Sequence, residues 1–294
     1  MMNAIQTEGL TKFYGRSRGI IDLDLEVREG EFYGFIGPNG AGKSTTIRIL
    51  MGLIHRTRGS AWILGRDISR EKEQILSEIG YLPSEAVFYP DMRGRDLIRL
   101  SADLHRKDCR KASLELCERL QLDPSRRISE LSFGNRKKLA VVCALQHDPR
   151  LCILDEPTGG LDPLMQKEFF EILKERNEKG MTVFLSSHIL SEVQRFCSRA
   201  AIIREGRIIA SGSVEELART NAKRVSVRGS FDASGLPDVR DLQISDDTVS
   251  FLYSGDINLL LSHLGRHPVM DLTISEPDLE EVFLHYYTEG DEQQ

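Results

Sequence analysis

The stretch Gly37-Pro38-Asn39-Gly40-Ala41-Gly42-Lys43-Ser44 fits the pattern G-x-x-x-x-G-K-[ST] at every fixed position. An apolar run, Phe32–Ile36, precedes it, and a helical pattern that begins at Thr45 follows it. Glycines let such a loop fold tightly, so that its backbone N–H groups and the helix N-terminus face an anion. Lys43 supplies a full charge for the phosphates, and the Ser44 hydroxyl is a hard oxygen ligand for Mg²⁺. The stretch therefore predicts a binding loop for ATP, or another nucleoside triphosphate, together with Mg²⁺.

A second apolar run, Leu151–Asp155, ends in an acid and is followed by Glu156. Parallel strands end at one edge of a sheet, where a phosphate loop also lies. Asp155 suits Mg²⁺ binding, directly or through water, and Glu156 suits polarising the water that attacks the γ-phosphate. Two acids at a strand end are also an ordinary solvated terminus. The phosphate loop upstream favours the catalytic interpretation.

The fold class follows from three apolar runs bounded by turn residues, at residues 32–36, 151–154 and 182–185. Such runs indicate buried strands of a parallel sheet covered by helices on both faces. Helical patterns follow the first two runs, which predicts a doubly wound α/β core. From about residue 84 to residue 150 apolar residues recur at spacings of three and four without a convincing strand. We interpret this part as a helical insertion, with helices over 94–104, 110–120 and 133–147.

The pattern changes after about residue 220, where short alternating segments begin. They predict strands over 225–227, 241–244, 249–253 and 269–274, and helices over 257–264 and 279–287. We therefore expect a nucleotide-binding domain over residues 1–220 and a small α+β domain over residues 221–294. A ferredoxin-like arrangement is one candidate for the second domain.

The composition limits the partners and the location of the chain. A formal net charge of −6 argues against a wide nucleic-acid surface, so we expect no nucleic-acid partner. No apolar run approaches the roughly 18 residues that suggest a membrane helix, and the N-terminus lacks the pattern of a secretory signal. The five cysteines are scattered without a C-x-x-C pair, which favours free thiols in a reducing cytosol. A role at a membrane would therefore need a membrane partner.

A predicted helix opens with Leu131-Ser132-Phe133-Gly134-Asn135, which resembles the LSGGQ signature of ABC ATPases. Ser132 and Gly134 match the signature, whereas Phe133 and Asn135 depart from it. Ser132 suits the N-cap of this helix, and the helix N-terminus favours an anion. A plain helix cap is the alternative interpretation of the same residues.

Three further positions resemble ABC ATPases and follow in family order. Gly160-Leu161-Asp162 resembles the D-loop behind the catalytic glutamate, and His188 resembles the switch histidine that contacts the γ-phosphate. Tyr14 resembles the aromatic residue on which adenine stacks. The alternatives are that His188 has a structural role and that Tyr14 is a tyrosine packed on the surface. The resemblance covers residues 5–217.

This resemblance implies a RecA-like P-loop NTPase core and an ATP-hydrolysing subunit that powers transport through membrane permease subunits. It also implies two such domains facing head to tail, with ATP between the Lys43 loop of one and Ser132 and Gly134 of the other. This chain carries both halves, so a homodimer could form two sites, and a heterodimer is the alternative. Glu156 and His188 would then be catalytic. The location implied is cytoplasmic, peripheral on the inner face of the cell membrane.

The end of the chain narrows the class of transporter. Residues 274–284, Ile-Ser-Glu-Pro-Asp-Leu-Glu-Glu-Val-Phe-Leu, resemble the E-P-[ST]-L-E-x-x-F ending of ATPases of drug, antibiotic and lantibiotic exporters, with Asp278 replacing the hydroxyl residue. An importer's ATPase would share the same fold. A soluble ABC ATPase acting on ribosomes or DNA usually has two nucleotide domains or a long coiled-coil insertion, which this chain lacks. The intact catalytic set argues against a non-hydrolysing regulatory module.

One position departs from the family where the core enters the helical insertion. ABC domains usually carry a glutamine there that reaches toward Mg²⁺ and the attacking water; here Ser84 follows Pro83, and Glu85 comes next. A serine hydroxyl is too short to span the same gap without a bridging water. Either Ser84 with a water or Glu85 replaces the ligand, or Ser84 merely makes the turn. We expect the loop over residues 84–93 to dock on the permease in each case.

Overall fold

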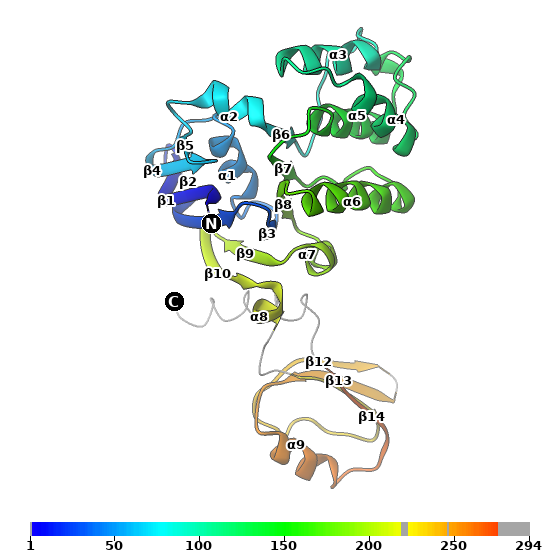
Figure 1. Ribbon diagram of the computed structural model, residues 1–294. Coiled ribbons are helices and arrows are strands. Elements are labelled where there is room, and N and C mark those ends of the chain that lie inside the picture. Colours follow the sequence, from blue (N-terminus) through cyan, green and yellow to red (C-terminus); the bar gives the residue numbers. More distant parts are fainter. Residues whose placement is uncertain (1, 219–222, 246, 276–294) are drawn as a thin grey trace. The chain divides into compact units, whose positions relative to one another are not determined.

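The computed structural model describes residues 2–218, 223–245 and 247–275 (Figure 1). Contacts divide the chain into two compact units, Met1–Val214 and Glu215–Gln294, whereas the sequence suggested a boundary near residue 220. Each unit is described by itself below.

A six-stranded sheet forms the centre of the first unit, in the order β10-β9-β3-β8-β7-β6. Neighbouring strands are parallel except for β10, which pairs antiparallel with β9 at one edge. Every residue of β3, β7 and β8 is buried, which explains why these strands read as continuous apolar runs. Figure 1 shows α1 and α6 on opposite sides of this sheet, as expected for a doubly wound core. The strands are β3 (Phe32–Ile36), β6 (Ile79–Leu82), β7 (Leu151–Asp155), β8 (Thr182–Ser187), β9 (Arg199–Arg204) and β10 (Arg207–Ser213).

An antiparallel sheet in the order β2-β1-β4-β5 completes this unit, and the sequence analysis did not predict it. The signal was present in β2, where Leu23, Leu25 and Val27 are buried and the residues between them are exposed. The two sheets share one apolar core, in which Leu23 of β2 and Phe35 of β3 belong to the same cluster. The strands are β1 (Asn3–Tyr14), β2 (Ser17–Arg28), β4 (Arg58–Ile63) and β5 (Arg66–Asp67).

The helical insertion lies between β6 and β7 in the sequence, and the structure confirms that no strand interrupts it among the described residues. Its elements are α3 (Gly94–Leu104), α4 (Arg110–Arg119), the 3₁₀ helix η1 (Ile128–Glu130) and α5 (Phe133–Leu145). The expected helices at 94–104, 110–120 and 133–147 match α3, α4 and α5 closely. The remaining helices of this unit are α1 (Lys43–Leu50), α2 (Lys72–Glu78), α6 (Pro163–Glu178) and α7 (Leu190–Phe196), and its last residue, Val214, begins α8 (Val214–Ala218).

The second unit contains most of α8, followed by an antiparallel sheet in the order β12-β13-β11-β14 with helix α9. Each crossover skips one strand: β13 lies between β11 and β12, and β11 lies between β13 and β14. That is the strand order of a split βαβ pair, as in ferredoxin-like folds, except that residues 230–238 form a loop where the first crossover helix would lie. The predicted helix at 279–287 and the exporter-like ending after residue 275 lie outside the described residues. The elements are β11 (Lys223–Gly229), β12 (Val239–Ser245), β13 (Thr248–Tyr253), α9 (Ile257–Leu264) and β14 (Val269–Ser275).

Candidate functional site

The phosphate loop joins β3 to α1 and closes around a lysine. The Lys43 ammonium donates to the backbone carbonyls of Gly37, at 2.6 Å, and Pro38, at 3.1 Å. Gly37 cannot carry a side chain, because a Cβ there would lie 2.3 Å from the carbonyl oxygen of Ile203. Gly42, with φ +115°, caps α1 in a conformation that L side chains rarely adopt. Gly40, with φ +81°, is also in this left-handed region, so glycine is favoured at all three positions for steric or conformational reasons.

Beside this loop lies a small cavity of about 170 Å³. It gathers residues from β1, the loop, α1 and the end of β7, so segments far apart in sequence meet at one place. Tyr14 is its aromatic wall, with 46 % of the residue exposed and its ring available to solvent. The lining residues are Tyr14, Arg18, Gly19, Asn39, Gly40, Gly42, Lys43, Ser44, Thr45 and Glu156.

Asp155 ends β7 and lies buried against two hydroxyl groups. The hydroxyls of Ser44 and Ser186 both donate to its Oδ1, each at 3.2 Å. Burial raises the pKa of the Asp155 carboxyl, and the nearby charge of Glu156 adds to this effect, while the two hydroxyls and Lys43 oppose it. A cation placed beside this carboxylate would favour its charged form.

Glu156 connects the loop lysine with the histidine at the end of β8. Its Oε1 lies 3.3 Å from the Lys43 ammonium and 3.3 Å from Nδ1 of His188. Its backbone has φ +46°, a left-handed conformation that is rare for a glutamate. The Glu156 N–H donates to the carbonyl oxygen of Ser186 at 3.0 Å, so strand β8 holds this turn in place. The geometry directs the carboxylate into the cavity beside the loop.

The residues at the loop suit a magnesium ion bound with phosphates. The Ser44 hydroxyl and the Asp155 carboxylate converge on one point at the sheet edge, and both are oxygen ligands of the kind Mg²⁺ prefers. Among the described residues no cluster of three or more His, Cys, Asp or Glu side chains is arranged to hold a metal. Two protein ligands agree with the way Mg²⁺ binds, through few carboxylates, several waters and substrate phosphates.

Helix α5 presents its N-terminus at a different place from this cavity. The Ser132 hydroxyl accepts the N–H of Asn135 at 3.2 Å and so caps α5, as predicted. A Cβ at Gly134 would lie 2.6 Å from the carbonyl oxygen of Gly160, so α5 packs closely on the loop behind Glu156. Neither Ser132 nor Gly134 lines the cavity at the phosphate loop.

Comparison with known proteins gives the family. Residues 20–159 match the family model described as ABC transporter. The bacitracin transport ATP-binding protein of Bacillus licheniformis is 34 % identical over 97 % of this chain and 97 % of that protein. The chain belongs to the ABC transporter ATP-binding proteins. It is therefore the ATP-binding, ATP-hydrolysing subunit of an ABC transporter.

Other similar proteins support the same assignment. The linearmycin resistance ATP-binding protein LnrL of Bacillus subtilis is 29 % identical over 96 % of this ABC protein and 97 % of its own chain. A solved structure of the ATP-binding subunit of an ABC transporter has a TM-score of 0.70 at 31 % identity, covering 74 % of this chain and 92 % of that one. A bacterial ABC transporter cassette solved as a dimer has a TM-score of 0.66 at 25 % identity, covering 71 % and 98 %.

Ser84 and Glu85 are the two candidates to replace the family glutamine at the entrance of the helical insertion. Neither of them lines the phosphate-loop cavity of this ABC protein. The Ser84 carbonyl oxygen accepts a bond from Lys137 at 2.9 Å, and Glu85 lines a second cavity of about 440 Å³. Phe88 and Phe133 line this second cavity too, so it lies between the loop that follows β6 and the start of α5. We call it the insertion groove.

Sequence reasoning missed three residues that line the phosphate-loop cavity of this ABC protein or bond to Asp155 and Glu156 beside it. Arg18 lines the cavity from β2, and Ser186 donates to Asp155 from β8; both lie on segments without a motif. Lys137 lies on α5 with only 1 % of its surface exposed and donates to the carbonyl oxygen of Glu156 at 3.2 Å. A lysine on the buried face of a predicted helix was the signal that could have revealed it.

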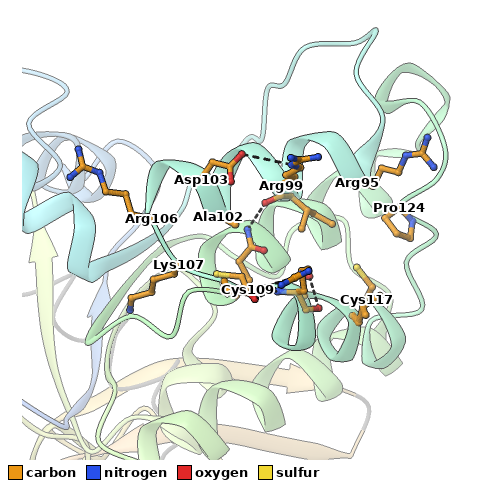
Figure 2. A pocket seen from close by; sticks show the side chains of 15 residues that line it. Arg95, Arg99, Ala102, Asp103, Arg106, Lys107, Cys109, Cys117 and Pro124 are labelled. Atoms are coloured by element: carbon orange, nitrogen blue, oxygen red, sulfur yellow. Dashed lines mark hydrogen bonds and ion pairs between the residues drawn. The ribbon is translucent and has the colours of Figure 1, made fainter.

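A third cavity, of about 820 Å³, lies in the helical insertion of this ABC protein, between α3 and α4 (Figure 2). Arg95, Arg99, Arg106 and Lys107 line it together with Cys109 and Cys117. Two of its basic groups form exposed ion pairs, Arg99 with Asp103 and Arg110 with Asp108. None of the predicted site residues lines it.

Proposed function

We propose that this ABC ATPase powers export across a membrane through partner permease subunits. Two relatives that align with nearly the whole chain are named for bacitracin transport and for linearmycin resistance, and both of these names concern antibiotics. These alignments include the second unit, so the similarity extends beyond the nucleotide site. No helix among the described residues is long and apolar enough to cross a membrane. An importer's ATPase is the alternative.

We assign the chemical roles from the geometry around Glu156. Lys43 and the backbone of the phosphate loop would hold the β- and γ-phosphates, and Ser44 with Asp155 would hold Mg²⁺. Glu156 would polarise the attacking water, and His188 would contact the γ-phosphate while it orients that carboxylate. The observation that carries this assignment is the position of one carboxylate oxygen, Oε1 of Glu156, 3.3 Å from both Lys43 and His188.

The second half of each site would come from another nucleotide-binding domain, which a second copy of this chain can supply. The phosphate loop covers bound ATP from one side only, and a capped helix N-terminus such as that of α5 favours an anion on the other. Ser132 and Gly134 would then contact the γ-phosphate held by the partner's loop. The dimeric cassette among the similar structures supports this arrangement.

The test of these roles compares two substitutions at the nucleotide site. Glu156→Gln removes the negative carboxylate but keeps the size of the side chain, so ATP binding should persist while turnover falls roughly 100-fold. The variant should accumulate as an ATP-bound dimer, visible by size-exclusion chromatography. Lys43→Ala should weaken nucleotide binding itself and give no trapped dimer. Wild-type turnover by Glu156→Gln would remove Glu156 from its role.

We propose that the permease docks in the insertion groove, next to the loop over residues 84–93. Phe88 lines the groove, while its neighbour Tyr89 is 70 % exposed and does not. In a reconstituted complex, Phe88→Ala should lower transport roughly tenfold with ATP hydrolysis within threefold, because a buried aromatic anchor carries much of an interface. Leu114→Ala is the control, because Leu114 is 69 % exposed on α4, outside this loop and the groove, and it should leave both rates unchanged. Normal transport by Phe88→Ala would place the docking site elsewhere.

The family glutamine that is missing at Ser84 leaves two candidates for its role. Ser84 with a bridging water, or Glu85, would approach the metal when the loop moves on nucleotide binding. Glu85 lines the insertion groove together with Phe88, so a shift of this loop would couple the groove to the nucleotide site. We therefore assign the loop to communication with the permease and keep both residues as candidate ligands.

A further inference from the structure

Lys137 is a cation on α5 with only 1 % of its surface exposed, and the catalytic scheme does not use it. Its ammonium donates to three backbone carbonyls, those of Pro83 at 2.9 Å, Ser84 at 2.9 Å and Glu156 at 3.2 Å. An ammonium group has three N–H donors, so all of them are used. Burying a charge is costly unless it is paired or hydrogen-bonded, and this bonding offsets that cost. Burial also lowers the pKa of Lys137 to about 8, although the charges of Asp155 and Glu156 oppose the shift.

The three carbonyls belong to two segments that matter for hydrolysis. Pro83 and Ser84 begin the loop that leads from the core into the helical insertion, and Glu156 is the proposed water-polarising residue. The left-handed backbone of Glu156, at φ +46°, is a strained conformation that the surroundings must hold. Its N–H is held by the carbonyl of Ser186, and its carbonyl oxygen is held by Lys137. The orientation of the Glu156 side chain thus depends on both anchors.

Lys137 also lies five positions after Ser132, the N-cap of α5. The helix is rigid over this distance, so a shift of its N-terminus moves the ammonium as well. Gly134 lies between the two and packs on the carbonyl of Gly160, which follows Glu156 by four residues. The part of the chain expected to meet the partner's ATP is therefore joined to the chain's own Glu156 by one buried hydrogen-bonded cation.

We propose that Lys137 is a positioning residue that sets the orientation of Glu156 and makes it depend on where α5 and the loop after Ser84 lie. The inference rests on the proposed role of Glu156. In each subunit, a shift of α5 on contact with the partner's ATP would move the Lys137 ammonium and, through it, the backbone of Glu156. ATP bound in one site would then align the glutamate of the other, and hydrolysis would depend on both halves of the dimer being closed.

The experiment uses the full-length chain and the substitution Lys137→Met, which keeps the length and bulk of the side chain but removes the three donors. Lys107→Met is the matched control, because the Lys107 ammonium also donates to a backbone carbonyl, that of His147 at 2.7 Å, elsewhere in the insertion. ATP turnover, KM and thermal unfolding are measured for both, together with dimer formation in ATP.

Lys137→Met should lower kcat roughly 10- to 100-fold, because a misplaced catalytic group loses that much without losing substrate affinity. KM should stay within threefold, and the variant should accumulate as an ATP-bound dimer like Glu156→Gln. Lys107→Met should show neither effect. Lys137→Arg, which keeps donors at this position, should recover part of kcat.

Two results for Lys137→Met would overturn the inference. A kcat within twofold of wild type for Lys137→Met overturns the inference, and so does a fall in kcat matched by weaker ATP binding without a trapped dimer, which marks a merely structural residue. The Glu156→Gln variant distinguishes a failure of the inference from a failure of the proposed role of Glu156. If Glu156→Gln is inactive while Lys137→Met is normal, only the inference fails. If Glu156→Gln retains full turnover, the proposed function of Glu156 fails and the inference with it.

Discussion

The phosphate loop before α1 and the N-terminus of α5 are both built for an anion, yet they differ in what surrounds them. At the loop, Lys43 already has carbonyl, carboxylate and cavity partners within its own chain. At α5, the Ser132 hydroxyl accepts the N–H of Asn135 in its own helix, and it has no other hydrogen-bond partner among the residues that the structure describes. The first region has most of the groups that a nucleotide site needs; we propose that the second supplies half of a site whose other half lies on another domain.

The largest expected effect comes from a substitution at the N-terminus of α5 that leaves the helix folded. Asp is as good an N-cap as Ser, so Ser132→Asp should keep α5 folded while it places a negative charge where the partner's γ-phosphate is expected. ATP hydrolysis by the full-length chain should fall roughly 100-fold. Binding of ATP to the isolated subunit, measured by fluorescence titration, should stay within threefold, since the phosphate loop is untouched.

Ser132→Asn is the control for this prediction. Asn caps a helix as well as Asp does but carries no charge. Hydrolysis should remain within tenfold of wild type. If Ser132→Asp is as active as Ser132→Asn, the N-terminus of α5 does not face a phosphate, and the comparison between the two regions fails.

The next effect concerns the attachment of the helical insertion to the core. His147 follows α5, has 2 % of its surface exposed, and stacks on His105 with ring centroids 3.6 Å apart. Its Nε2 lies 3.1 Å from the carbonyl oxygen of Ile79, which begins β6. Burial, with the neighbouring His105 and Lys107, lowers the pKa of His147 from 6.5 to about 4. The neutral ring therefore helps to hold the insertion against the core.

The sign of the resulting pH dependence follows from these two pKa values. Between pH 6.5 and pH 4 the unfolded chain binds a proton at His147 and the folded chain does not. Stability is therefore full above pH 6.5 and is lost as the pH falls toward 4, by about 3 kcal/mol in total. Urea unfolding at pH 7 and pH 5 should show a steeper loss for wild type than for His147→Gln. Equal slopes would contradict the assignment.

The smallest expected effect concerns the second unit. Residues after about 220 carry no phosphate-binding motif, so a chain ending near residue 220 should bind ATP within threefold of the full-length protein. We expect the truncation to impair dimer formation or docking on the permease instead. A truncated chain that stays folded but no longer binds nucleotide would show that the domain boundary is wrong.

The sequence was a good guide where chemistry is local. Eight consecutive residues determine the phosphate loop, because their glycines, lysine and serine act within a few ångströms of each other. The helices of the insertion were also predictable, since their apolar spacing is independent of the rest of the fold.

Sequence reasoning failed where partners are distant along the chain. The antiparallel sheet was missed although buried and exposed residues alternate along β2. Strand preference depends on the neighbouring strands, and the sequence does not show which strands pair with β2. Lys137 was missed for a related reason: its carbonyl partners at Pro83 and Glu156 lie far from it along the chain, on either side of the helix that carries it. The left-handed backbone of Glu156 likewise depends on Ser186 of another strand.

The account's central claim is that each ATP lies between the Lys43 loop of one chain and the Ser132 helix of another. Full-length chains carrying Lys43→Ala and chains carrying Ser132→Asp are therefore mixed in equal amounts, and dimer formation in ATP, measured by size-exclusion chromatography, is compared with that of each variant alone. Half of the dimers formed at random would contain one site with an intact loop and an intact helix, so an ATP-dependent dimer should appear in the mixture and in neither variant alone. Hydrolysis by this dimer should stay low, because its second site cannot hold ATP. A mixture that forms no more dimer than the two variants separately would show that the loop and the helix do not act across chains, and would contradict the claim.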